Sequence, residues 1–209
     1  MVRSCFYSFL ILCVFFGLSK DCQASNVGLF PGTRVSAFQS VYSGEKGKSF
    51  AESSSGVGAG VSVYMDGKYL TPYFGFKVGS MAGTQMFLDN ASEVSTSFNY
   101  YSASAEAGFH LFPIERRKKG FNVYFSGGGV IGYNFVALNK EASLENIPYS
   151  DQSFSTGYVA GVGSEWILNS ADKNKWNLNA EVLFKNESST LFNQRYDLSC
   201  MVFSLGLGW

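Results

Sequence analysis

The chain has 209 residues, with 16 basic and 16 acidic side chains, 17% aromatic residues, 23 glycines and only 4 prolines. A net charge near zero without a long basic tract gives no electrostatic basis for nucleic-acid binding. Aromatic residues favour pleated strands and glycines favour turns, so the composition points to an all-β protein.

Residues 1–24 have the layout of a secretory leader. Arg3 stands before an apolar run, and the sequence "CQA" before Ser25 matches a small-residue cleavage site. The apolar run is shorter than the roughly 20 residues that a bilayer-spanning helix needs. We therefore expect cleavage between Ala24 and Ser25, and export of residues 25–209 as one domain.

Apolar side chains then recur at every second position in a series of segments, which is the period of a strand. Val57, Ala59 and Val61 alternate with glycine in one of them, and Asp66-Gly67 follows as a hairpin turn. The predicted strands lie within residues 34–42, 56–65, 68–78, 100–112, 121–135, 154–168, 176–185 and 200–209. The inward face of the first strand stays unassigned. The predicted fold is an eight-stranded antiparallel up-and-down barrel.

The connections between these segments alternate in length. The short ones are residues 66–67, 113–120 and 169–175, and the long, polar ones are residues 43–55, 79–96, 137–152 and 186–194. Transmembrane barrels have short turns at one end and long external loops at the other. The pattern therefore favours a barrel that spans a membrane, with four loops outside the cell.

The less apolar face of each strand carries mainly glycine, serine and alanine. A face exposed to water is usually dense in charged residues, whereas the narrow interior of an eight-stranded barrel accepts small side chains. We therefore place this face in the lumen, together with its few charged residues: Arg34, Lys77, Glu106, Glu165, Glu181 and Lys185. An ion-pair network that plugs the lumen is the favoured interpretation, and a thin path for ions or small apolar solutes is the alternative.

Three tryptophans fall on the apolar faces at strand ends. Trp166 ends one strand, Trp176 begins the next, and Trp209 ends the last. All three are expected at the short-turn end of the barrel, where an aromatic girdle would meet the membrane interface. Tryptophans that merely fill a core would share no such level.

The residues 25–209 resemble the small outer-membrane β-barrels of the OmpA and OmpX type. The resemblance rests on the architecture and on the closing segment "MVFSLGLGW". In that family, apolar residues at alternate positions before a final aromatic imply recognition by the barrel assembly machinery, and Phe203, Leu205, Leu207 and Trp209 fill these positions. The resemblance implies a porin-like monomer in the outer membrane of a Gram-negative bacterium, in contact with outer-membrane lipid. Its role would be structural or interactive, with the long loops available to an external ligand.

No catalytic, metal or cofactor-binding residues are assigned. His110 shares a strand face with Ser104, but about 20 Å of strand separates them, so the two side chains cannot form a nucleophile and base. A serine on another strand would keep a lipid-modifying envelope enzyme as the least favoured alternative. The protein is thus expected not to be an enzyme.

Overall fold

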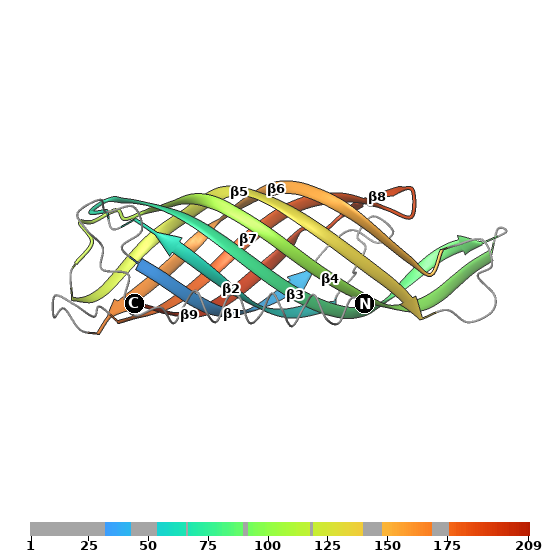
Figure 1. Cartoon of the computed structure of the whole chain (residues 1–209), viewed down its shortest axis with the longest axis horizontal. Coiled ribbons are helices and arrows are strands. Elements are labelled where there is room, and N and C mark those ends of the chain that lie inside the picture. The colour runs from blue at the N-terminus through green and yellow to red at the C-terminus, as the bar shows by residue number, and fades with distance from the viewer. Residues whose placement is uncertain are drawn as a thin grey trace, which may run out of the picture.

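The computed structural model describes residues 32–42, 54–65, 67–89, 92–117, 119–139, 148–168 and 176–209. This part of the chain is built of strands and turns (Figure 1). The strands are β1 (Gly32–Tyr42), β2 (Ser55–Tyr64), β3 (Leu70–Asp89), β4 (Ser92–Leu111), β5 (Gly120–Asn139), β6 (Ser150–Ile167), β7 (Asn177–Leu191), β8 (Gln194–Asp197) and β9 (Cys200–Gly208). No helix within these ranges is long and apolar enough to cross a bilayer.

Eight of the strands close into a ring. Each strand from β1 to β7 pairs antiparallel with the next, β7 pairs with β9, and β9 returns to β1. The short strand β8 extends the hairpin between β7 and β9 and occupies no position of its own in the ring. The predicted eight-stranded antiparallel up-and-down barrel is thereby confirmed.

The register around the ring fixes the tilt of the strands. Starting at Ser36 on β1, the residues paired across β2 to β6 lead to Ser189 on β7. In the opposite direction, through β9, the paired residues lead from Ser36 to Asn179 on β7. The two routes therefore differ by ten residues. Ten residues of about 3.3 Å rise, set against eight strands about 4.8 Å apart, correspond to a tilt of about 40°. Such a barrel has an interior just wide enough for side chains.

The strands are longer than the sequence predicted at one end of the barrel. Residues 79–96 are not a long loop, because β3 continues to Asp89 and β4 begins at Ser92, and their hairpin projects beyond the other strands (Figure 1). Strand also replaces loop at the edges of residues 137–152 and through most of residues 186–194. The described part of the long-loop end is therefore largely built of paired strands.

The two faces of the barrel exchange polarity along its axis. On β4 the buried inward residues Ser104 and Glu106 give way, toward the long-loop end, to Phe98 and Tyr100, while the outward Ser97 there is exposed. The apolar core accordingly lies toward the long-loop end. It comprises Tyr42, Met81, Phe98, Tyr100, Val136, Leu138, Leu183, Leu191, Tyr196, Leu198, Cys200 and Val202.

Several sequence predictions fall outside the described residues. They are the leader 1–24, the cleavage site at Ala24 and Ser25, nearly all of the loop 43–55 and the centre of the loop 137–152. The short turn at 169–175 also lies outside them.

Candidate functional site

A charged cap closes the short-turn end of the interior. Arg116, in the turn before β5, donates to both carboxylate oxygens of Glu165 on β6, with 2.8 Å from Nη2 to Oε2. The Asn122 side chain donates to the same carboxylate at 3.2 Å. The guanidinium also lies over the rings of Tyr64 and Phe112, at 5.7 and 5.3 Å from their centroids. A bidentate pair of this kind holds the turn across the opening of the barrel.

A second cluster centres on the carboxylate of Glu181, deeper in the barrel. Its Oε1 lies 3.3 Å from Arg34 Nη1 and 3.4 Å from His110 Nε2, and it accepts a hydrogen bond of 2.7 Å from the Tyr124 hydroxyl. Asn179 donates to the same hydroxyl. Three strands, β1, β4 and β5, thus each supply one polar group to the buried carboxylate that β7 carries, as a buried charge requires.

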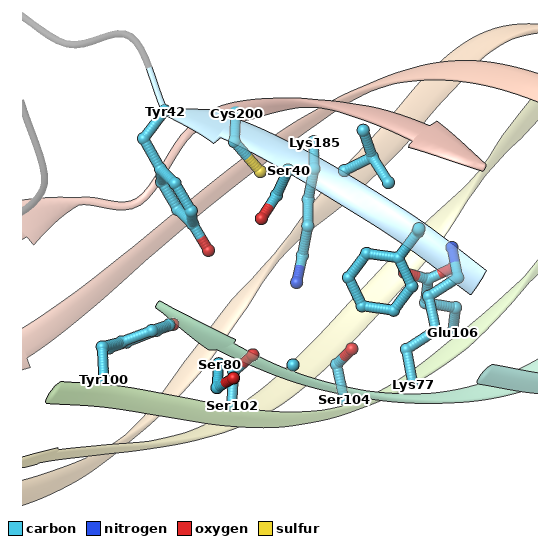
Figure 2. Close-up of a pocket in the computed structure, with 13 residues that line it drawn as sticks. Ser40, Tyr42, Lys77, Ser80, Tyr100, Ser102, Ser104, Glu106, Lys185 and Cys200 are labelled. Carbon is cyan, nitrogen blue, oxygen red and sulfur yellow. The ribbon is translucent and has the colours of Figure 1, made fainter. Parts of the chain in front are cut away.

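A third ion pair separates two small cavities. Lys77 Nζ lies 2.7 Å from Glu106 Oε2, and both residues line a cavity of about 30 Å³ on one side and one of about 20 Å³ on the other. Figure 2 shows the larger cavity, with Lys77 and Glu106 at one end and Tyr42 and Tyr100 at the other. At about 10–15 Å³ per water, the larger cavity has room for about two or three water molecules and the smaller one for about one or two.

The fourth pair lies toward the long-loop end. Lys185 Nζ is 2.5 Å from Glu187 Oε2, and the other oxygen of Glu187 accepts from the Ser155 hydroxyl. Asn134 donates to Ser155 at 2.7 Å and accepts from Tyr100 at 2.5 Å. These contacts continue the polar network up to the apolar core.

The structure gives each of the six predicted lumenal charges an oppositely charged partner within the barrel. Arg34 meets Glu181, and Lys77 meets Glu106. Sequence reasoning missed the partners of the remaining two, which are Arg116 and Glu187. Glu187 was missed because the sequence pattern predicts a loop over residues 186–194, although Glu187 lies on the same strand face as Glu181 and Lys185 at the two-residue period.

The outer face carries an apolar belt bounded by aromatic residues. Trp166, Trp176 and Trp209 are exposed, and the rings of Trp176 and Trp209 lie 6.0 Å apart. When the pairing register is corrected for the strand tilt, the three tryptophans lie within about 3 Å of one another along the barrel axis. Toward the other end, Tyr133 and Phe154 are exposed, with ring centroids 5.3 Å apart.

The belt has the height of a membrane. Phe154 and Trp166 lie on β6 and both face outward. At about 3.3 Å per residue and a tilt of about 40°, they are about 30 Å apart along the axis, which equals the hydrocarbon thickness of a typical bilayer. Phe203, Leu205 and Leu207, on the outward face of β9, belong to the same belt.

His110 is held inside the barrel. Its ring lies between Tyr73 and Tyr124, with centroid distances of 4.6 and 4.4 Å, and the residue is 4% exposed. Its cross-strand neighbour is Ser126. Among the described residues, no three His, Cys, Asp or Glu side chains are placed to hold a metal ion.

No protein-family model matches the sequence, and no curated protein matches it. The chain is similar to solved structures that include two of Ail, the attachment invasion locus protein of Yersinia pestis. One is 13% identical with a TM-score of 0.37, covering 85% of this chain and 95% of that chain. The other, in complex with the heparin analogue sucrose octasulfate, is 15% identical with a TM-score of 0.41, covering 85% and 93%.

Proposed function

We propose that this protein is an outer-membrane β-barrel with a plugged lumen, and that its role is structural or interactive at the cell surface. The observation that best supports this proposal is that the inner and outer faces of the barrel exchange polarity along its axis. Within the belt the exposed side chains are apolar and the interior is charged, as lipid on the outside requires. Beyond the belt the interior is apolar and the exterior polar, as water on the outside requires.

A soluble barrel would not produce this arrangement. Exposed residues such as Phe109, Phe125, Ile131 and Leu205 form a continuous band, and monomeric soluble proteins rarely expose such large apolar areas. The long-loop end, where β3 and β4 project, would then stand outside the cell and offer a surface to an external ligand.

Cell fractionation tests the membrane location. We expect the mature protein in the outer-membrane fraction, with a gel mobility that changes when the sample is heated, because closed barrels resist detergent until heat unfolds them. Recovery from the soluble periplasmic fraction with unchanged mobility would overturn the proposal.

The plug is supported by how the interior is filled. Four ion pairs occupy successive levels of the barrel, and the two cavities beside Lys77 and Glu106 hold only a few waters. A narrow channel is the second candidate, because these cavities meet at a single ion pair. The lipid-modifying enzyme is less supported, since His110 is enclosed by Tyr73 and Tyr124 inside the barrel.

A further inference from the structure

We infer that the short-turn end of the barrel binds the headgroups of anionic phospholipids through an exposed basic patch formed by Lys68, Arg117 and Lys119. This inference rests on the proposed membrane location. It concerns the end of the barrel opposite to the long loops, and it names the lipid class that this end selects.

The patch is assembled by two adjacent turns. The Arg116 backbone N–H donates to the Lys68 carbonyl at 2.8 Å, which holds the turn before β3 beside the turn before β5. Asn122 fixes the Arg117 backbone through two hydrogen bonds, one to its N–H at 2.7 Å and one to its carbonyl at 3.2 Å. Hydrogen bonds therefore hold the backbone in place at Lys68 and at Arg117.

The charges in these turns divide between the interior and the surface. Arg116 points into the barrel, where Glu165 neutralises it. Arg117 and Lys119 are exposed, and Lys68 is 77% exposed and lies 3.2 Å from Glu115, its one ion-pair partner among the described residues. A solvent-exposed pair of this kind is weak, so the surface retains an excess of positive charge.

The patch lies at the depth of lipid headgroups. Lys119 precedes Phe121 by two residues, and Phe121 pairs with Trp166 of the aromatic girdle. The tilt sets Phe121 about 3 Å beyond Trp166, and two more residues of the tilted strand add about 5 Å, so Lys119 lies about 8 Å outside the girdle. The headgroup region extends about 5–8 Å beyond the hydrocarbon on each side, so the cations meet the phosphate level.

Apolar neighbours favour a lipid over a soluble acidic partner. Ile114, in the same turn as Arg117, is 74% exposed, and Tyr69, next to Lys68, is 53% exposed. Apolar and aromatic residues beside cations are typical of surfaces that lie on anionic membranes. A soluble polyanion would leave Ile114 in water.

Quenching of tryptophan fluorescence by brominated lipids tests this inference in the full mature chain. The three tryptophans of the sequence all lie at the short-turn end, so quenching reports on lipids beside the patch. The protein is reconstituted in phosphatidylcholine vesicles with increasing phosphatidylglycerol, and brominated forms of each lipid give their relative binding constants. R117Q/K119Q is compared with R195Q, which removes an exposed cation from β8 at the other end.

We expect the wild type and R195Q to prefer phosphatidylglycerol, and each cation lost from the patch to lower that preference by up to about fivefold. High salt should reduce it as well. An unchanged preference in R117Q/K119Q would overturn the inference. So would binding of soluble polyglutamate through the patch without any lipid preference. Absence of quenching by brominated phosphatidylcholine would instead overturn the membrane location itself.

Discussion

The pair between Arg116 and Glu165 shows how single residues hold the barrel together. The two side chains are 7% and 1% exposed, and a buried carboxylate that loses its cation is left uncompensated. We expect Arg116→Ala to lower the free energy of unfolding by about 3 kcal/mol, at the low end of the range for such pairs, because Asn122 still donates to the carboxylate. Urea-induced unfolding in neutral lipid vesicles measures this.

The neighbouring Arg117 provides the matched control for that measurement. Its side chain is exposed, so Arg117→Ala should change the free energy of unfolding by less than about 0.5 kcal/mol. The double variant R116A/E165Q should regain part of the loss, because it removes the unpaired charge. Equal stabilities for R116A and R117A would show that the interior pair contributes nothing.

Residues that act from a turn are the ones that the sequence could not assign. The alternation of the strands identified Glu106, Glu165 and Glu181 as lumenal, since period two fixes the face of each position. Arg116 lies in an irregular segment, where no period indicates direction. Its role depends on how the turn folds over the opening, which is a tertiary property.

Glycines in the interior create space for large polar side chains. A Cβ on the inward Gly163 would lie 2.4 Å from the ring of the buried Tyr124, whereas a Cβ on Gly129, which is exposed on the outer face of β5, would meet nothing within 4 Å. We expect Gly163→Ala to cost about 1–3 kcal/mol of stability because Tyr124 must leave Glu181 and Asn179. Thermal or urea unfolding should show Gly129→Ala close to the wild type, and equal losses would contradict the packing argument.

Substitutions at outward-facing strand positions can show whether the outer face of the barrel contacts lipid or water. Leu205 on β9 is 70% exposed and near the middle of the belt, where arginine in lipid costs about 2–4 kcal/mol. We expect Leu205→Arg to lose that much stability in vesicles, whereas Thr190→Arg, exposed beyond the belt on β7, should lose almost none. If both variants unfold like the wild type, the belt does not face lipid.

The length of β3 and β4 was the main element-scale error of the sequence prediction. Residues 79–96 contain polar outward positions, which resemble a loop when an apolar outer face is assumed throughout. Beyond the belt the rule reverses, and Phe98 faces inward while Ser97 faces outward. The sequence thus predicts the strands inside the apolar belt, but the extension of β3 and β4 can be recognised only when the level of the belt is known.

Whether the barrel conducts ions depends on the whole molecule, because the number of strands in the closed ring and their tilt together set the inner width of the barrel. With eight strands and an offset of ten residues, the interior is filled by side chains rather than left open. Four ion pairs cross it in succession, and Lys77 with Glu106 stands between the two small cavities. We therefore expect no steady open-pore current from the wild type in planar bilayers.

The same recordings can identify a path if one exists. A continuous water path must pass two of these carboxylates, Glu106 between the two cavities and Glu165 at the cap. A steady wild-type current abolished by Glu106→Gln or Glu165→Gln would show that ions pass through the lumen, and the plug would be wrong. A silent wild type, in vesicles where Trp166, Trp176 and Trp209 report insertion, would mean that the interior charges stabilise the barrel and that function resides on its surface.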